Sequence, residues 1–428
     1  MKKKTKEFQA PKGTYDILPD TQPYWEKFYK TAKELAQDYG FQKIDLPMFE
    51  DYELYARGTG ATTDIVTKQM YVLKTPGGHT FALRPEFTPG IVRAYLQDGL
   101  SNMPQPIKLF SFGPLFRYEQ PQQGRYRQLY QFDLEAIGDK EPILDAQIIQ
   151  FCVHLLRNLG LKKINIQLNS IGCPQCRPAY RRSLVDYYRS RKSKLCPDCQ
   201  RRLKENPLRL LDCKEEKCQL VKSQAPASID YICPDCKNHF KKVLEFLDEL
   251  EIPYFLNSSL VRGLDYYTKT VFEIWMDGDE KASGISLGGG GRYDDLIEEL
   301  GGKPTPAVGV GLGADRIILA MKKEEVRTPS LFNPKVFLVQ LGDMGKKKSL
   351  KLFENLHQAG IVAAESLSRD SIKAQLKIAD RLGVKFSLIL GQQEALDRTI
   401  IIRDMATGAQ EIVSQDKIVE EIKKRLSK

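Results

Sequence analysis

The chain has 428 residues, of which 42% are hydrophobic, and a formal net charge of +10 at pH 7. At about 100–200 residues per domain this length predicts two to four domains, and the hydrophobic fraction excludes wholesale disorder. Runs of about 18 apolar residues are missing, and no apolar run follows the basic N-terminus, so neither a membrane span nor a signal peptide is predicted. We therefore expect a cytoplasmic protein without a membrane partner.

The first part of the chain alternates between helical and strand-like patterns. In chain order these patterns predict a helix at 21–39, a strand at 41–51, a hairpin at 68–86, two strands within 107–138, a helix at 142–159 and a strand at 164–172. Pro47 demotes its strand to a sheet edge or ends it. This part of the chain is therefore expected to be rich in antiparallel hairpins.

Cysteine dominates the segment 173–238, which holds eight of the nine cysteines, 15 Lys and Arg, and 8 Asp and Glu. The eight form four pairs, three of them C-x-x-C and one C-x₄-C: Cys173/Cys176, Cys196/Cys199, Cys213/Cys218 and Cys233/Cys236. Without a secretory signal, metal ligation is favoured over disulfides, and two such hooks together make a tetrahedral zinc site. The alternative is reduced, unligated thiols in a helical insertion. Cys152 lies apart in an apolar run and is expected in the core.

The spacing of the four pairs does not fix how they combine. A sequential scheme joins the first pair to the second. A nested scheme joins the first pair to the fourth and leaves the middle two as an inner site. We favour nesting, because an insertion must leave and re-enter its host domain at nearby points, which brings Cys176 and Cys233 together. Eight thiolates would then hold two structural zinc ions in a segment of about 65 residues, small enough to need such support.

The second part of the chain changes character at a linker. Before it, the patterns predict a helix at 238–251, a strand-rich region at 254–287, a glycine run at 288–291, a helix at 292–300 and a strand, turn and helix over 305–321. After it they predict strands at 336–342, 361–366, 386–391 and 399–405 and helices at 346–359, 370–382 and 415–426. Such alternation predicts a small α/β domain with a mixed sheet.

Two segments carry the excess of positive charge. Segment 173–238 has a balance of +7, from 15 basic and 8 acidic residues, and segment 332–428 has +5, from 17 and 12. Both could face nucleic acid, with ordinary solvated surface as the alternative.

Polar residues alternate along the two strands predicted within 107–138. Arg117 and Glu119 end the first strand, and Gln131, Asp133 and Glu135 alternate along the second. Paired as a hairpin, these strands would place Gln131 and Glu135 on one face beside Arg117. Carboxylate, amide and guanidinium groups together suit a zwitterionic substrate next to a phosphate, which arginine grips with two hydrogen bonds. The alternative is a charged sheet face exposed to water.

A second polar group lies where the chain enters a later strand. Arg262, Asp265, Tyr266 and Tyr267 crowd together there, and Gly263 would let another group approach the backbone closely. A tyrosine pair in a strand is more often part of a core.

Glycine-rich segments raise the question of nucleotide binding. The glycines at 288–291, placed before a helix, could offer backbone N–H groups to a ligand. Gly309, Gly311 and Ala314 mimic G-x-G-x-x-A, but only glutamates of the charged linker could supply the acid that the dinucleotide fingerprint needs about 20 residues on. We reject that site, and the P-loop motif is absent from the sequence. If ATP binds, an antiparallel sheet with arginines must hold it.

Together these segments resemble the class II aminoacyl-tRNA synthetases, and specifically the histidyl-tRNA synthetase family, over almost the whole chain. The resemblance rests on a motif 1 helix and strand ending at Pro47, motif 2 at FRYE and QFDLE, motif 3 at AVGVGLGADRI, and the histidine-specific segments LRPEFT and LVRGLDYY. It implies an α+β fold: a catalytic core on an antiparallel sheet with flanking helices, a cysteine-rich helical insertion and a C-terminal α/β anticodon-binding domain. The expected parts are core 1–172, insertion 173–238, core 239–325, linker 326–334 and anticodon-binding domain 335–428.

The resemblance also implies an activity. L-histidine would be activated with ATP and Mg²⁺ to histidyl-adenylate and pyrophosphate, and then transferred to the 3′ end of tRNA-His by a homodimer joined through motif 1. In such in-line nucleotidyl transfer, positioning and charge neutralisation dominate, and no side-chain nucleophile is required.

Residue by residue, the resemblance assigns roles to matching positions. Arg117 and Arg262 are the catalytic pair at the α-phosphate, and Arg117 also holds the attacking carboxylate. The ATP-binding residues are Arg117, Glu119, Arg125 and Arg316. The α-amino group is held by Glu86, Thr88 and Gln131, and the imidazole is read by Glu135, Tyr266 and Tyr267. The residues facing the tRNA acceptor end are Gln122 and Arg127.

Two positions depart from the family pattern. Leu129 stands where an adenine-stacking aromatic is expected, and Gln120 stands where many relatives carry arginine. The first bears on adenine stacking, and the second on reading of the extra 5′ guanylate of tRNA-His. Two other interpretations remain: a synthetase-like regulatory subunit without charging activity, and a zinc-ribbon nucleic-acid-binding protein without enzyme activity.

Overall fold

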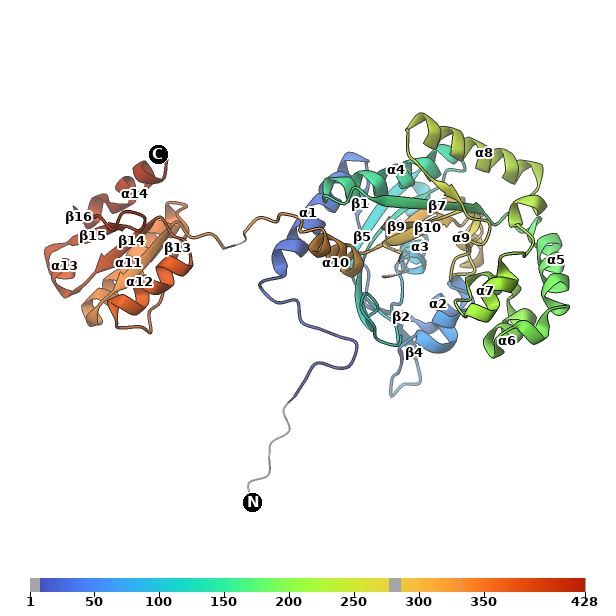
Figure 1. Ribbon diagram of the computed structural model, residues 1–428, viewed down its shortest axis with the longest axis horizontal. Coiled ribbons are helices and arrows are strands. Elements are labelled where there is room, and N and C mark those ends of the chain that lie inside the picture. Colours follow the sequence, from blue (N-terminus) through green and yellow to red (C-terminus); the bar gives the residue numbers. More distant parts are fainter. Residues whose placement is uncertain (1–7, 277–285, 331, 428) are drawn as a thin grey trace, which may run out of the picture. The chain divides into compact units, whose positions relative to one another are not determined.

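The chain forms two compact units. A computed structural model of the protein describes residues 8–276, 286–330 and 332–427, and its units are Met1–Thr328 and Pro329–Lys428. The boundary between them falls inside the stretch 326–334. Figure 1 shows each unit with its own sheet and helices. Among the described residues, none of the helices combines the length and apolar character needed to cross a membrane.

An eight-stranded sheet organises the first unit, in the order β1-β5-β6-β11-β10-β9-β7-β8. Its strands are β1 Gln42–Lys43, β5 Ile107–Phe116, β6 Gln128–Ile137, β7 Ile164–Ser170, β8 Phe255–Leu256, β9 Thr268–Met276, β10 Gly288–Arg292 and β11 Ala307–Gly313. Only the outermost pairs, β1 with β5 and β7 with β8, run parallel, so the predicted antiparallel core is confirmed. Part of the strand-rich region predicted at 254–287, residues 277–285, lies outside the described residues.

One face of this sheet is covered by long amphipathic helices: α1 Gln22–Asp38, α4 Pro142–Asn158, α8 Pro234–Glu249 and α10 Ala314–Lys323. Phe110, Phe132 and Leu134 of the sheet join the apolar side chains of these helices in the main core. Because side chains alternate along a strand, the neighbours of Phe132 and Leu134 on β6 project from the opposite face. That opposite face is therefore available for polar groups.

Shorter elements flank the opposite face. They are α2 Tyr52–Gly58, α3 Thr88–Gln97, α9 Leu296–Glu299 and a small sheet of β2 Phe49–Asp51, β4 Thr80–Leu83 and β3 Val72–Lys74. The strand predicted at 41–51 is in fact two strands, β1 and β2, in different sheets, interrupted around Pro47. Such an interruption follows from the missing N–H of proline.

The glycine run is a strand and not the loop before a helix that the sequence suggested. Gly288–Gly291 lie in β10, between β9 and β11 in the middle of the large sheet. The N–H groups of these glycines therefore belong to a strand within the sheet and do not form an anion-binding turn.

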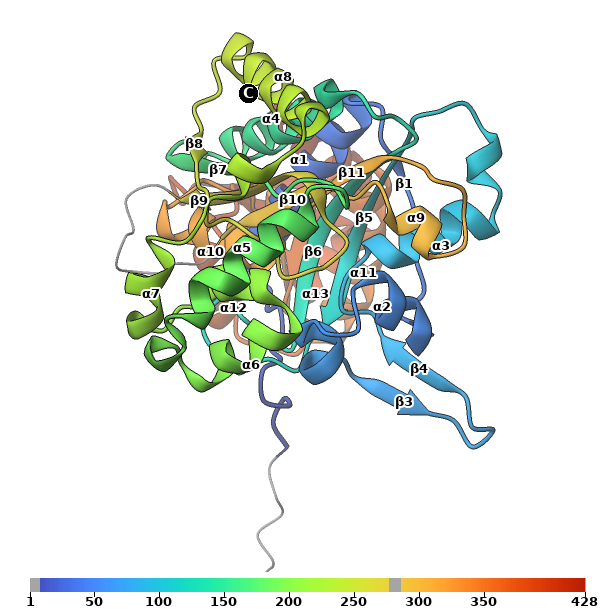
Figure 2. The same cartoon turned by 90° about the vertical axis from the view of Figure 1, so that its right-hand side faces the viewer.

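The insertion between β7 and α8 is helical, as predicted, with α5 Arg177–Arg189, α6 Pro197–Glu205 and α7 Glu216–Lys222. Figure 2 shows these three helices grouped on one side of the first unit. Two of the C-P-x-C motifs open helices, because Cys196 and Cys233 are N-caps and the following prolines occupy the first turn. As a result α8 begins at Pro234, earlier than the predicted helix at 238–251.

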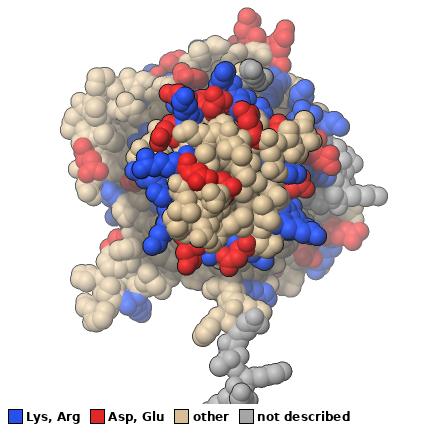
Figure 3. All heavy atoms as spheres, turned by 90° about the vertical axis from the view of Figure 1, so that its left-hand side faces the viewer, with Lys and Arg blue, Asp and Glu red and all other residues tan. Residues whose placement is uncertain are grey.

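The second unit has the predicted mixed α/β fold, with strand order β13-β12-β14-β15-β16. Its elements are β12 Val336–Gln340, α11 Gly342–Gln358, β13 Ala363–Glu365, α12 Ile372–Arg381, β14 Phe386–Leu390, α13 Gln392–Asp397, β15 Thr399–Asp404, β16 Gln410–Ser414 and α14 Ile418–Leu426. Pairs β12·β13 and β12·β14 are parallel, and the last two strands are antiparallel. The face of this unit in Figure 3 carries basic side chains around its rim, mixed with acidic ones.

Candidate active site

A cavity of about 550 Å³ lies over the polar face of the large sheet. It gathers side chains from segments that are far apart in the sequence. Of the residues singled out above, its lining contains Glu86, Thr88, Arg117, Glu119, Arg125, Gln131, Glu135, Arg262, Tyr266, Tyr267 and Arg316. The alternative of a solvated charged face is wrong for β6, because Asp133 and Glu135 are only 3% and 1% exposed.

Glycines form the floor of the cavity because the side chains that cross it need the space. A Cβ on Gly309 would lie 1.6 Å from Oε2 of Glu135, its register partner on β6. A Cβ on Gly289 would lie 2.5 Å from Nη1 of Arg262. The two glycine-rich strands β10 and β11 thus let a carboxylate and a guanidinium lie flat across the sheet.

Three buried carboxyl groups, of Glu86, Asp133 and Glu135, gather on one side. Glu86 accepts hydrogen bonds from Thr59 Oγ1 at 2.5 Å and from the Tyr266 hydroxyl at 2.8 Å. Glu135 accepts from Thr88 Oγ1 at 2.6 Å and from the Tyr293 hydroxyl.

The environment of these carboxyl groups disfavours their negative charge. Burial raises the pKa of Glu86, and it raises the pKa of Glu135 to about 8. Burial and the charge of Glu135 raise the pKa of Asp133 well above its usual value. A cationic ligand would offset these costs, so this side of the cavity suits an ammonium or imidazolium group.

Arginines gather on another side. Arg316 donates from Nε to Gly124 O at 2.9 Å and from Nη1 to Ser286 O at 2.7 Å. Burial and the charge of Arg125 lower the pKa of Arg316 to about 10. Arg117 is anchored by Nε to Pro85 O at 2.8 Å. Clustered guanidinium groups that repel each other are stabilised by an anion, and phosphate fits them best.

Arg262 joins the two sides of the site. Its guanidinium forms an ion pair with Glu273 and lies 5.8 Å from the ring centroid of Tyr267. Burial opposes the charged form, but Glu273, Tyr267 and Tyr266 together outweigh burial and raise the pKa of Arg262. Arg262 is therefore a fixed positive charge within the cavity.

Three supporting residues were missed from the sequence. Tyr293 and Glu273 line the cavity and hold Glu135 and Arg262. Asp315 accepts from the Tyr130 backbone N–H at 2.6 Å and from the Tyr15 hydroxyl, which fixes the start of α10 against β6. Tyr293 directly follows the glycine strand, and its proximity to that run was the only local signal.

The residues proposed for tRNA lie in the loop between β5 and β6. Within the described part of the chain, the cavity lining includes neither Gln122 nor Arg127. Arg127 stacks on the Tyr118 ring at 3.9 Å from its centroid, and Gln122 pairs through its backbone with Arg125. Leu129, at the position expected to be aromatic, does line the cavity.

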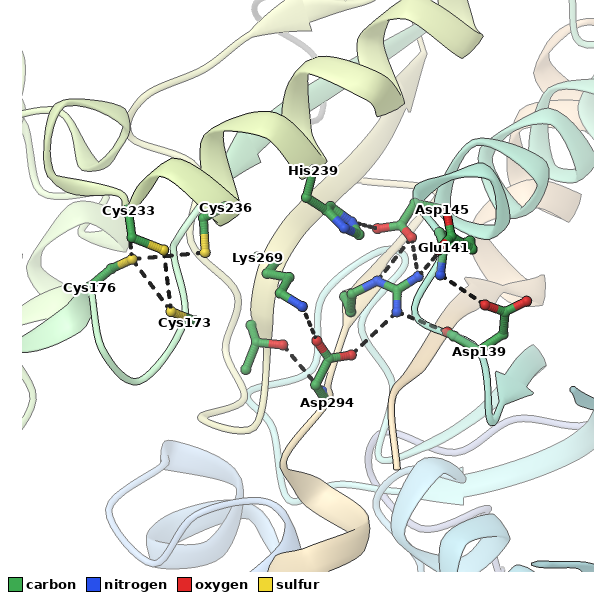
Figure 4. Close-up of polar contacts among 12 residues, drawn as sticks. Asp139, Glu141, Asp145, Cys173, Cys176, Cys233, Cys236, His239, Lys269 and Asp294 are labelled. Atoms are coloured by element: carbon green, nitrogen blue, oxygen red, sulfur yellow. Dashed lines mark hydrogen bonds and ion pairs between the residues drawn. The ribbon is translucent and has the colours of Figure 1, made fainter. Parts of the chain in front are cut away.

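The insertion brings its cysteines into two groups of four. The outer cluster is Cys173, Cys176, Cys233 and Cys236, and the inner cluster is Cys196, Cys199, Cys213 and Cys218; within each, all Sγ atoms lie within 4.8 Å of one another. Figure 4 shows the outer cluster at the start of α8. This is the nested arrangement, and all nine cysteines are free of disulfides, with Cys152 fully buried in the core.

The geometry of both clusters fits a tetrahedral metal ion. Zinc–sulfur bonds of about 2.3 Å place tetrahedral sulfurs about 3.8 Å apart. The Sγ–Sγ distances are 3.9 Å for Cys173–Cys233, 3.8 Å for Cys176–Cys236 and 3.9 Å for Cys196–Cys213. Backbone N–H groups also point at sulfur, as at Cys176, which accepts from Cys233 N at 3.0 Å. Such donors stabilise thiolates.

Comparison with known proteins covers both units. Residues 13–317 match the family described as histidyl-tRNA synthetase, and residues 335–425 match the family described as anticodon binding domain. A histidine--tRNA ligase of Dehalococcoides mccartyi is 45% identical over 98% of this chain and 100% of its own. One from Acetivibrio thermocellus is 43% identical over 97% and 99%. The crystal structure of apo histidyl-tRNA synthetase from S. aureus is 35% identical, covers 97% of this chain and 99% of its own, and has a TM-score of 0.80.

Proposed function

This chain belongs to the histidyl-tRNA synthetase family, and from that premise we propose that its cavity converts L-histidine and ATP to histidyl-adenylate and pyrophosphate and then passes histidine to the 3′ end of tRNA-His. The observation that carries the proposal is one cavity with buried carboxyl groups on one side and arginines on another. A zwitterionic amino acid and a triphosphate need that combination. Histidine-dependent exchange of pyrophosphate into ATP is the test. A role in translation also implies a cytoplasmic location.

The residues divide the work by charge. Glu86, Thr88 and Gln131 hold the α-amino group, while Glu135 with the tyrosines of 266–267 reads the imidazole. Burial supports these roles, because carboxylates with raised pKa values gain most from a cationic partner.

The arginines hold the nucleotide. The ATP-binding residues are Arg117, Arg125 and Arg316, with Glu119 beside Arg125 at 3.9 Å. Arg117 and Arg262 stabilise charge on the α-phosphate as the histidine carboxylate attacks, and pyrophosphate leaves. Mg²⁺ bound with ATP would neutralise phosphate charge, and the carboxylate of Glu119 in the lining is an oxygen donor that suits it. Gln122 and Arg127 face the acceptor end of tRNA.

The rival interpretations account for less. A regulatory subunit without charging activity would not need to keep Glu86, Glu135 and Arg262 in one cavity. A zinc-ribbon protein accounts for the cysteines and leaves this cavity without a role.

The second unit is proposed to bind the anticodon. Its support is the match of residues 335–425 to the anticodon binding domain family and the exposed lysines Lys347, Lys348 and Lys351 on α11. Deleting residues 329–428 should lower kcat/KM for tRNA charging far more than kcat/KM for histidine activation, because phosphate contacts supply much of tRNA affinity. Both reactions are measured on the same preparation. An equal fall in both would mean that the second unit is needed for folding instead.

The active form is proposed to be a homodimer joined through the motif 1 region. Exposed apolar side chains lie beside it: Met48 and Phe49, directly after Pro47, are each 53% exposed, and Val72 and Leu73, on β3 of the same small sheet as Phe49, are each 45% exposed. Burial against a second copy would protect such an edge. Light scattering at micromolar concentration should give twice the chain mass of 48.8 kDa. A fully active monomer would contradict the proposal.

Each cysteine cluster is proposed to hold one structural zinc ion. Protein purified without chelator should contain two zinc ions per chain by elemental analysis. Cys173→Ser and Cys233→Ser should each lose the same ion, because both belong to the outer cluster, and Cys218→Ser should lose the other. Metal-free protein with eight titratable thiols and undiminished tRNA charging would refute this.

A further inference from the structure

The segment that links the two halves of the inner cluster touches the histidine-specific segment. After Cys199 the chain completes α6, turns at Asn206 and forms a 3₁₀ helix, Pro207–Asp212, before returning to Cys213. Leu210 and Leu211 of this turn are buried. At the tip of this turn, the side chains of Asn206 and Arg209 point out of the insertion and contact residues 262–265, in the segment before β9.

Arg209 is bound to the backbone next to Arg262. Its Nη1 donates to the carbonyl oxygen of Arg262 at 3.3 Å, and the same atom lies 3.2 Å from where a Cβ on Gly263 would stand. Its Nη2 forms ion pairs with Asp64 at 3.2 Å and Asp212 at 3.5 Å. The side chain is only 11% exposed, so these contacts hold it firmly. Gly263 therefore lets the Arg209 side chain approach the backbone closely, as its position in the sequence suggested.

Asn206 makes a second contact three residues away. Its Nδ2 donates to Oδ1 of Asp265 at 2.9 Å. Asp265 itself packs against Gly60, where a Cβ would lie 2.7 Å from the Asp265 carboxylate. The backbone from Arg262 to Asp265 is therefore held from the insertion at both ends.

The inner cluster holds the two ends of the segment that carries Asn206 and Arg209. Cys199 and Cys213 bound it, and Sγ of Cys213 lies 3.9 Å from Sγ of Cys196. Cys196 and Cys213 also line the active-site cavity. A zinc ion at the four sulfurs would close the segment into a loop and limit the movement of its tip.

We propose that Arg209 and Asn206 are positioning residues for Arg262, and that the inner cluster with zinc bound is the clamp that fixes them. The inference rests on the proposed role of Arg262 at the α-phosphate. According to this proposal, the rate of histidine activation depends on whether zinc occupies the inner cluster. A misplacement of about 1 Å at a reacting group can cost about 10²-fold in rate, so a small shift of the 262–265 backbone is enough.

Substitution of Arg209 tests the positioning role. Arg209→Met should lower kcat of pyrophosphate exchange by about 10–100-fold, with zinc content and thermal midpoint like those of the unmodified protein. The Kd of histidine by calorimetry should stay within about twofold, because Arg262 acts on charge that develops in the transition state. Arg209→Lys, which keeps one donor for the Arg262 carbonyl, should recover part of the rate.

The control is Arg201→Met, on the preceding helix α6. Arg201 forms surface ion pairs with Asp198 and Glu205, so its loss should leave kcat unchanged. Asn206→Ala removes the contact with Asp265 without touching the cysteines and should lower kcat in the same direction as Arg209→Met. Normal kcat in Arg209→Met, or an equal loss of histidine affinity, would overturn the positioning role.

Removal of an inner ligand tests the clamp. Cys218→Ser should lose one zinc ion and lower kcat. Combining Cys218→Ser with Arg209→Met should lower kcat no further, because both changes act through the same clamp on Arg262. Loss of that zinc with normal kcat would overturn the clamp. Unmodified protein without histidine-dependent exchange would instead overturn the proposed function, whatever the variants do.

Discussion

Arg262→Ala should lower the rate of histidyl-adenylate formation by about 10²–10³-fold, the effect typical of removing one preorganised charge from a site where negative charge develops. Arg262 is held in place by Glu273 and by the ring of Tyr267, and its side chain is only 18% exposed. Its charge is therefore already oriented and partly free of water before the α-phosphate is attacked. Single-turnover formation of the adenylate measures the effect without the tRNA step.

A matched double variant separates charge stabilisation from a side effect. Without Arg262, the carboxylate of Glu273 is left unpaired in the cavity and would repel ATP. Arg262→Ala combined with Glu273→Ala removes that repulsion, and the rate should stay low. Recovery of the rate in the double variant, or near-normal exchange in Arg262→Ala, would contradict the role of Arg262.

Arg292→Met should lower the free energy of unfolding by about 3–5 kcal/mol, because it leaves a buried carboxylate without its partner. Arg292 and Asp145 are both fully buried, and Arg292 Nε donates to Asp145 Oδ2 at 3.0 Å. Arg292 also bonds the carbonyl oxygens of Asp139 and Glu141 at 3.0 and 3.1 Å, and His239 lies 3.2 Å from Asp145. Figure 4 shows His239 pointing toward Asp145, with Asp139, Glu141 and Asp294 near them.

Urea unfolding of the full chain measures this effect, with Arg292→Met combined with Asp145→Leu as the matched control. Replacing both partners by apolar residues removes the unpaired charge, so the double variant should regain most of the lost stability. Burial alone would raise the pKa of Asp145, but Arg292 and His239 lower it to about 2. The stabilisation is therefore complete above about pH 4 and is lost as the pH falls toward 2. A single variant as stable as the unmodified protein would contradict this account.

Alternation along one strand made much of the active site predictable. Gln131 and Glu135 are four residues apart, and each directly neighbours a core residue, Phe132 or Leu134, so alternation places them together on the opposite face, and the structure has them there. The nested cysteine clusters could also be predicted, because an insertion must leave and re-enter its host domain at nearby points, although the cysteine spacing by itself allowed two schemes.

Other features depend on contacts that no local pattern contains. The glycines of β10 lack side chains to alternate, and glycine is needed at 289 because of the space taken by Arg262, which lies in the segment before β9. Helix α3 was missed because seven of its residues, from Thr88 to Tyr95, are buried on several sides and leave no polar stripe. The contacts of Arg209 and Asn206 could not be predicted from the sequence, because they form only when the folded insertion packs against residues 262–265.

Histidine-dependent exchange of labelled pyrophosphate into ATP tests the central claim most directly. The unmodified protein, with ATP and Mg²⁺, should exchange label when L-histidine is present and stay at background with each other amino acid, because the buried carboxyl groups of Glu86 and Glu135 are placed for an ammonium group and an imidazole. The same preparation should then charge tRNA-His. Folded protein that gives no exchange with histidine, or that exchanges with a different amino acid, would contradict the account.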